Sequence, residues 1–366
     1  MTWRMPAETA PQERVWMAFP SDGYTLGDTA AEAEEARSTW AAVAHAVLEF
    51  EPVTMVVDPG GSADGGTGGT DGTGARDARA TAARHLSADV DVLEAPLDDA
   101  WMRDIGPTFV LDPAGRLGAV DWIFNGWGGQ DWASWDRDAG IAALVTRAAG
   151  AIPVSSLLVN EGGGIQVDGT GTVIVTETVQ LDPGRNPHAT RARVEAELAR
   201  TIGATHAIWL PRGLTRDQAR FGTRGHVDIV AAIPAPGTLL VHAQNDPAHP
   251  DYTVTRELRA VLAASTDAAG RPWTIIDLPA PARLSDAEGF VDYSYVNHLV
   301  VNGGVIACGF GEAQADAAAR SILEDAYPGR KVVTVDARPL FARGGGIHCI
   351  TQQQPATALT RRNVWR

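Results

Sequence analysis

The chain is poor in cysteine, because Cys308 and Cys349 are the only two in 366 residues. Two thiols give no disulfide framework, so we expect a reducing, cytoplasmic compartment. No apolar run approaches the length that spans a bilayer, and residues 1–8 lack the apolar core of a signal peptide. These absences exclude a disulfide-stapled secreted domain and predict a protein with no membrane partner.

Positive charge is also scarce, since 30 Lys and Arg stand against 45 Asp and Glu and the net charge is −15. Nucleic acid is therefore excluded as a partner, because phosphate binding needs clustered cations. The negative field would attract a small cationic substrate, although the solubility of an acidic protein explains the same charge.

Metal-ligand clusters are missing as well. The nine histidines are scattered, and His226 stands two residues before Asp228. A metal site would require a third ligand at helical or short-strand spacing, and none completes the pair. We therefore predict neither a metal site nor a cofactor.

What the chain has in abundance is turn residues and a sizeable apolar fraction. With 39 Gly, 22 Pro and 45% hydrophobic residues, it is predicted to be a turn-rich globular protein with a large core. Its length suits two average domains or one large closed architecture. Residues 59–75, PGGSADGGTGGTDGTGA, are too polar and glycine-rich to join a core. We predict one catalytic domain over residues 1–366, interrupted by this flexible surface insert.

A unit of two strands, a helix and a third strand recurs along the chain. Strand-forming residues flank a turn in four hairpin-like segments: 108–124, 164–179, 227–244 and 295–311. A helical stretch follows each hairpin: around 136–150, 188–202, 253–268 and 312–327. A strand-like run ends each unit: 153–159, 205–211, 273–279 and 331–337. In helix 188–202, Val194, Leu198 and Ile202 form an apolar stripe, as expected for packing on one face.

The two ends of the chain supply a fifth unit. A strand at 15–20, a helix at 31–49 and a strand at 53–57 lack one hairpin strand, and a strand at 347–352 lacks a partner. Pairing the last strand with the first would close a ring of five α/β units and leave loops converging on a central axis.

Cys349 follows a run of glycines at 344–346, close to the end of the chain. Glycines allow the backbone to approach a bound group closely, which makes Gly346 a candidate substrate contact. The alternating residues that follow predict a strand with the thiol on one face and His348 on the other, so we expect His348 to be structural. The alternative for Cys349 is an inert, buried thiol.

His226 and Asp228 are two residues apart, so on a strand they would share a face. His226 is a candidate general acid and base because its intrinsic pKa lies near neutrality, and a structural histidine is the alternative. Trp101 is a candidate substrate contact. Asp104 lies three residues later in an apolar setting, where a carboxylate needs a cationic partner, unless it merely pairs with Arg103 at a surface turn. Two carboxylates can bind the two edges of a guanidinium. The thiol, the imidazole and the two acids together therefore suit attack of the thiol on a planar cation.

Two further residues extend the candidate site. Glu161 precedes three glycines and would hold the His226 ring in its protonated form, or it is a simple loop acid. Trp127 lies in the glycine-rich segment 125–129 and would line a narrow channel, or it belongs to the core.

The chain resembles the agmatine deiminase family, within the wider bacterial peptidylarginine-deiminase-like group. The resemblance rests on ordered segments along the whole chain: WMRDIGPTFV, NGWGG, EGGGIQVDGTGT, GRNP, IWLP, GHVD, SYVN and GGGIHCITQQQP. It implies the pentein fold, a pseudo-five-fold α/β propeller.

The resemblance also implies residue roles. Cys349 matches the nucleophile, His226 the acid/base, and Asp104 and Asp228 the guanidinium clamp, while Glu161 matches the glutamate of a Glu-Gly-Gly motif. The implied reaction is hydrolysis of agmatine to N-carbamoylputrescine through a covalent thiouronium, in polyamine metabolism and without a cofactor.

Two arginines depart from the family pattern. Arg224 stands directly before Gly-His-Val-Asp, where acids are usual, and Arg343 replaces a small residue. If either side chain enters the pocket, a substrate that bears a carboxylate, such as free arginine or another guanidino acid, would fit better than agmatine. The same reaction on peptidyl-arginine is an alternative. An amidinotransferase and a non-catalytic guanidine-binding protein are further alternatives, and homo-oligomerisation stays open.

Overall fold

Five small sheets dominate the computed structural model, which describes residues 2–60 and 78–358. Four of them combine an antiparallel hairpin with a parallel third strand. Their strands are β4 (Thr108–Leu111), β5 (Leu117–Ile123) and β6 (Ile152–Val159); β7 (Gln166–Val167), β8 (Thr172–Thr176) and β9 (His206–Leu210); β10 (Ala231–Ala235), β11 (Thr238–Ala243) and β12 (Thr274–Pro279); β15 (Leu299–Val301), β16 (Gly304–Gly309) and β17 (Lys331–Asp336).

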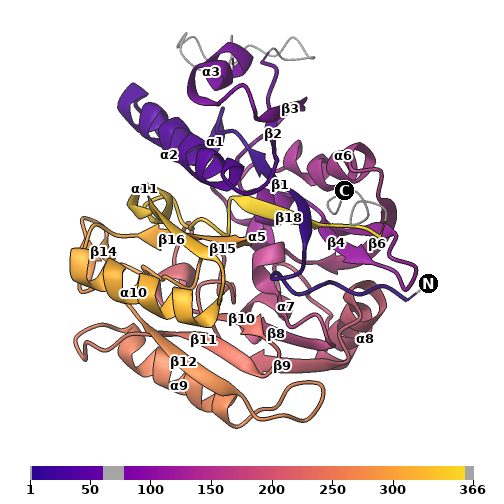
Figure 1. Ribbon diagram of the computed structural model, residues 1–366, viewed down its shortest axis with the longest axis vertical. Helices are drawn as coiled ribbons and strands as arrows, with labels where there is room; N and C mark the ends of the chain where they lie inside the picture. The colour runs from indigo at the N-terminus through magenta and orange to yellow at the C-terminus, as the bar shows by residue number, and fades with distance from the viewer. Residues whose placement is uncertain (1, 61–77, 359–366) are drawn as a thin grey trace.

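A helix connects the second and third strands of each of these sheets. The four helices are α6 (Ile141–Ala148), α8 (Arg191–Ile202), α9 (Asp251–Ala263) and α10 (Ala313–Ala326). The four predicted strand–strand–helix–strand units are thereby confirmed. Figure 1 shows these helices and α2 (Ala30–Leu48) toward the periphery of the view, with their colours following the chain around the molecule.

The fifth sheet joins the two ends of the described chain. Its order is β18 (Thr351–Pro355), β1 (Gln12–Ala18), β2 (Val53–Val57) and β3 (Asp91–Glu94). β18 runs antiparallel to β1, as predicted, and the yellow and indigo strands lie together in Figure 1. Helix α2 crosses over to the parallel strand β2. Strand β3 and helix α3 (Ala78–His85) were not predicted.

Local sequence signals explain where α8 begins and ends. The Thr190 hydroxyl accepts a hydrogen bond from the Arg193 amide at its start. At its end Gly203 adopts a left-handed φ of 71°, which glycine tolerates best. Val194 and Leu198 are fully buried, so the predicted apolar stripe of 188–202 faces the core.

Short elements complete the description. They are α1 (Gly23–Leu26), α4 (Met102–Ile105), α5 (Gly126–Gly129), α7 (Glu177–Gln180), α11 (Arg338–Phe341), the hairpin of β13 (Ser285–Asp286) with β14 (Gly289–Phe290), and turns of 3₁₀ helix at Asp138–Gly140, Gly162–Gly164 and Arg216–Gln218. None of the helices in the described ranges is both long and apolar enough to cross a bilayer.

Two segments expected to be strands are turns. The segment 347–352 becomes a strand only at Thr351, and residues 347–350 form a turn. The segment from His226 to Asp228 is irregular, and β10 begins only at Ala231. Of the predicted insert 59–75, residues 61–75 lie outside the described ranges.

Truncating Leu198 should measure the contribution of the α8 stripe to stability. Leu198→Ala removes a fully buried side chain and should cost about 2–5 kcal/mol, lowering the urea midpoint and Tm. Leu157→Ala is the matched control, because Leu157 is 90% exposed and the same deletion should cost less than about 0.5 kcal/mol. Equal losses in the two variants would contradict this packing.

Candidate active site

The thiol of Cys349 lies in the turn just before β18, and it is 6% exposed. Its Sγ is 3.4 Å from Asp228 Oδ2, and the side-chain amide of Asn297 donates to it at 3.3 Å. A Cβ on Gly345 would come within 3.1 Å of Sγ and 2.6 Å of the Trp101 ring. The glycine run therefore allows Trp101 to pack beside the thiol, and the ring of Trp101 also contacts Trp40 edge-on.

Gly346 supports the same turn through Asn297. A Cβ at this position would lie 2.3 Å from Asn297 Oδ1, which accepts a hydrogen bond from the His348 amide at 3.0 Å. The absence of a side chain thus lets Asn297 bind both the backbone and the thiol of the turn. A direct contact of Gly346 with substrate stays a prediction.

His226 and Asp228 reach the site from a turn rather than from the predicted strand. The buried carboxylate of Asp217 accepts hydrogen bonds from the amides of Thr223, Gly225 and His226, at 2.7, 2.7 and 3.0 Å. Gly225 has a left-handed φ of 119°. These bonds replace a strand ladder, and both side chains still lie beside Gly163, where a Cβ would be 2.4 Å from His226 Nδ1 and 3.1 Å from Asp228 Oδ2.

The imidazole of His226 lies between two carboxylates. Its Nε2 is 3.2 Å from Glu161 Oε2, and its Nδ1 is 3.9 Å from Asp104 Oδ1. A Cβ on Gly163 would lie 2.4 Å from this Nδ1, so glycine is needed for the close approach. Burial lowers the pKa of His226, but the surrounding acids, including Asp228, outweigh it and raise the pKa to about 9.

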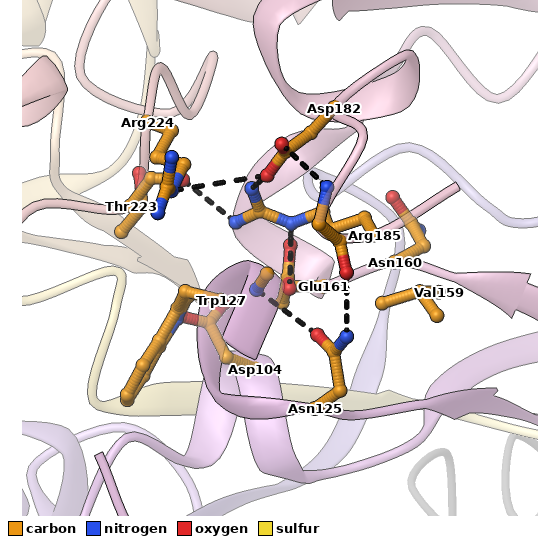
Figure 2. A network of polar contacts seen from close by, with 12 residues as sticks. Asp104, Asn125, Trp127, Val159, Asn160, Glu161, Asp182, Arg185, Thr223 and Arg224 are labelled. Carbon is orange, nitrogen blue, oxygen red and sulfur yellow. Dashed lines mark hydrogen bonds and ion pairs between the residues drawn. The ribbon is translucent and has the colours of Figure 1, made fainter. Parts of the chain in front are cut away.

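Asp104 is buried on α4 and is held by two donors. Its Oδ2 accepts from the Trp127 indole at 2.9 Å, and its Oδ1 accepts from the Gly163 amide at 3.2 Å. Burial raises the pKa of Asp104 to about 6, and the nearby His226 opposes that rise. Trp127 has a φ of 55°, unusual for a bulky residue, and stacks on Trp132. Both predicted residues are therefore in the site, side by side in Figure 2.

Arg185 forms an ion pair with Glu161. No role for Arg185 was expected from the sequence. Its Nε lies 3.0 Å from Glu161 Oε1, its Nη1 bonds Asp182 at 3.0 Å, and its Nη2 bonds the Thr223 carbonyl at 2.6 Å (Figure 2). Arg185 and His226 together outweigh burial and lower the pKa of Glu161. The one sequence signal was Arg185 within the Gly-Arg-Asn-Pro segment.

The groups around Cys349 favour its protonated thiol. Burial, Asp228 and Asp104 raise the pKa of Cys349 well above its ordinary value, although the Gly346 amide and Asn297 oppose them. Asp228 Oδ1 and His226 Nδ1 are buried and have no hydrogen-bond partner among the residues described. These two atoms are available to a bound group.

The two arginines that depart from the family pattern have protein partners. Arg343 donates to the carbonyls of Thr25 and Glu32 at 2.7 and 2.9 Å, and so it ties the glycine-rich segment to α1 and α2. Arg224 is 3.8 Å from Asp182, and a dashed line joins the two residues in Figure 2. Arg343 therefore gives no support for a carboxylate-bearing substrate.

His348 does not face away from the site, contrary to the sequence-based expectation. Its Nδ1 is 2.9 Å from Asp228 Oδ2, and its Nε2 is 2.8 Å from Glu8 Oε1. The expectation was wrong because it assumed strand geometry, whereas the 347–350 turn directs adjacent side chains to neighbouring positions. Glu8, like Arg185, was missed.

Comparisons with known proteins extend over nearly the whole chain. Residues 4–355 match the family described as Porphyromonas-type peptidyl-arginine deiminase. A Streptomyces coelicolor protein, provisionally named an agmatine deiminase, is 54% identical over 98% of this chain and 100% of its own. The agmatine deiminase of Pseudomonas fluorescens is 39% identical over 97% of this chain and 96% of its own.

A solved structure shares the fold. The agmatine deiminase of Enterococcus faecalis superposes with a TM-score of 0.86 at 30% identity, covering 97% of this chain and 96% of that one. The mixed α/β fold is therefore that of a solved agmatine deiminase. The chain belongs to the Porphyromonas-type peptidyl-arginine deiminase family.

Proposed function

We propose that the chain hydrolyses a small guanidine, with agmatine as substrate and N-carbamoylputrescine and ammonia as products. The observation that carries the proposal is the Cys349 thiol, 3.4 Å from Asp228, beside the cluster of His226 and Asp104. The relatives named agmatine deiminase support agmatine as the substrate. The position of Arg343 removes one argument for a guanidino acid.

Asp104 and Asp228 would grip the guanidinium through charge-assisted hydrogen bonds to its planar edges. Asp228 Oδ1 has no partner among the described residues, and the Trp127 indole orients Asp104. The bound cation adds positive charge beside Cys349, which lowers the cost of forming the thiolate. Substrate binding would thus activate the nucleophile.

In the first step the Cys349 thiolate attacks the central guanidinium carbon and forms a C–S bond. Protonated His226, held by Glu161, donates its proton to the departing nitrogen, and ammonia leaves. An S-alkylthiouronium remains on the sulfur.

In the second step the neutral His226 removes a proton from water, and the hydroxide attacks the thiouronium carbon. As the C–S bond breaks, the new hydroxyl group gives up its proton to the released ammonia or to solvent, and the neutral ureido product leaves. The thiolate and the imidazolium are restored. Over one turnover a guanidinium and water become a ureido product and ammonium, so atoms and charge balance and no redox partner is needed.

The five sheets support a pseudo-five-fold propeller within one catalytic domain. Each sheet repeats the same connection, β18 completes the first one, and the chain colours run around the view in Figure 1. The two unpaired cysteines support a reducing, cytoplasmic setting for this domain.

A substrate panel tests the reaction directly. Purified protein should release ammonia and a ureido product from agmatine faster than from arginine, 4-guanidinobutyrate or an arginyl peptide. Release without an added amine also separates hydrolysis from amidino transfer. A requirement for an amine acceptor, or binding without any product, would contradict the proposal.

Cys349→Ser should lower kcat at least about 1000-fold, because a hydroxyl is a poor nucleophile at neutral pH. Agmatine should still bind, which isothermal titration can measure. Cys308→Ser is the matched control, since Cys308 is also buried and its thiol donates to the Asn297 carbonyl at 3.0 Å. A fully active Cys349→Ala enzyme would rule out the covalent mechanism.

The pH profile of kcat/KM should be bell-shaped. Asp104, with a pKa of about 6, must be ionised to bind the cation, and His226, with a pKa of about 9, must be protonated to donate. Glu161→Gln removes an anion from His226, so its pKa should fall and the alkaline limb should move to lower pH. Glu257→Gln, at an exposed ion pair with Arg212, should leave the profile unchanged. An unmoved alkaline limb in Glu161→Gln would refute the pairing.

A further inference from the structure

A second buried imidazole lies between two carboxylates, on the far side of Asp228. His348 contacts Asp228 Oδ2 at 2.9 Å and Glu8 Oε1 at 2.8 Å. His348 is 3% exposed and Glu8 8%, so water screens neither contact effectively. The mechanism proposed above uses neither residue.

Arg103 extends this chain of contacts and ties it to the nucleophile. Its Nη1 lies 3.9 Å from Glu8 Oε1, and its Nε donates to the His348 carbonyl at 3.2 Å. Its backbone amide donates to the Cys349 carbonyl at 3.1 Å. One buried arginine therefore holds both Glu8 and the turn that carries the thiol.

The same order of residue types supports Asp104, the other carboxylate proposed to bind the guanidinium. Arg185, Glu161 and His226 lead to Asp104, through contacts of 3.0, 3.2 and 3.9 Å. The order is the same along the second chain of contacts, which runs Arg103, Glu8, His348 and Asp228. Asp104 and Asp228 are thus each contacted by a histidine, which contacts a glutamate, which in turn contacts an arginine.

An imidazole between two buried carboxylates is favoured as a cation. Burial and Arg103 lower the pKa of His348, but Glu8 and Asp228 outweigh them and raise it. Burial raises the pKa of Glu8, but the positive charges of His348 and Arg103 outweigh this effect and lower the pKa to about 2. Asp228 faces Cys349 and the cations His348, His226 and Arg103, which outweigh burial and lower its pKa.

We propose that Glu8 and His348 are positioning residues, which keep Asp228 ionised and aimed at the bound guanidinium. The charge on His348 compensates the buried Asp228, and Glu8 keeps that charge and the ring orientation in place. This inference rests on the proposed function, because it assigns support to one half of the substrate clamp.

Glu8 can act in this way because its segment is fixed to the body of the protein. The Met5 amide donates to the Ile202 carbonyl at 2.9 Å, and the Gln12 side chain donates to the Glu8 carbonyl at 2.8 Å. Residues before β1 are therefore part of the site, although they are remote from Cys349 in sequence.

Glu8→Gln tests the inference, because it removes the charge of Glu8 and keeps its shape and its backbone contacts. With His348 less often protonated, Asp228 loses its compensating charge and its pKa should rise. We expect KM for agmatine to increase roughly tenfold, with kcat changed less than about threefold. The acid limb of kcat/KM, set by Asp104 in the wild type, should become steeper and move to higher pH as the ionisation of Asp228 adds to it. Glu8→Asp keeps the charge and should restore part of the KM.

Glu49→Gln is the matched control, since Glu49 pairs with Lys331 at the surface and should leave KM and the acid limb unchanged. If Glu8 were merely structural, Glu8→Gln would lower Tm with wild-type KM and pH profile. That result, in a folded variant, would overturn the inference.

Nitrogen NMR of histidine-labelled protein supplies a readout that does not depend on turnover. His348→Gln assigns the signal, which should be that of a doubly protonated ring at pH 7 in the wild type and should titrate at lower pH in Glu8→Gln. A neutral wild-type ring overturns the inference, even if Glu8→Gln does not fold. Wild-type protein that forms no ureido product contradicts the proposed function instead, and the NMR result still decides the state of His348.

Discussion

The site depends on one constraint, which is that every buried charge needs an oppositely charged partner. Removing an ion from water costs several kcal/mol unless an opposite charge and hydrogen bonds replace the solvent. The groups that meet around the thiol satisfy this in two sets, which are Arg185, Glu161, His226 and Asp104, and Arg103, Glu8, His348 and Asp228. Each ion fixes the position of the next, so protein contacts hold Asp104 and Asp228, the two carboxylates proposed to bind the guanidinium.

The two sets also explain how a buried cysteine can become reactive. Each contains two acids and two groups favoured as cations, so near neutral pH these eight groups are close to electrically balanced. A thiolate alone would disturb that balance, which agrees with the raised pKa of Cys349. A guanidinium and a thiolate together would preserve it. Under the proposed mechanism, activation of the nucleophile would therefore depend on the positive charge of the ligand.

The sequence predicted the features that depend on short-range patterns. Hairpins followed by helices repeat within a few tens of residues, and α8 has its cap residues and its stripe of Val194 and Leu198 close together. Cys349, His226, Asp104 and Asp228 could be identified because few combinations of side chains suit attack on a planar cation. Their meeting depended on the resemblance and on the pairing of the first and last strands.

Other features could not be read from local patterns. The turns at 226–228 and 347–350 resemble strands in sequence, but Asp217 and Asn297 bind their backbone amides from other segments. Glu8 and His348 are separated by 340 positions, so no spacing rule connects them. Arg185 was inconspicuous because a buried arginine is identified only once its acids are located.

The pairing of β1 with β18 has a consequence for biosynthesis. Glu8 lies four residues before β1 and is therefore synthesised long before Cys349, which lies two residues before β18. A nascent polypeptide that has not yet extended to residue 349 lacks both the Cys349 sulfur and strand β18, which completes the first sheet. The proposed nucleophile and the last strand of the first sheet are therefore synthesised within a few residues of each other, and shorter nascent chains lack the thiol on which the proposed reaction depends.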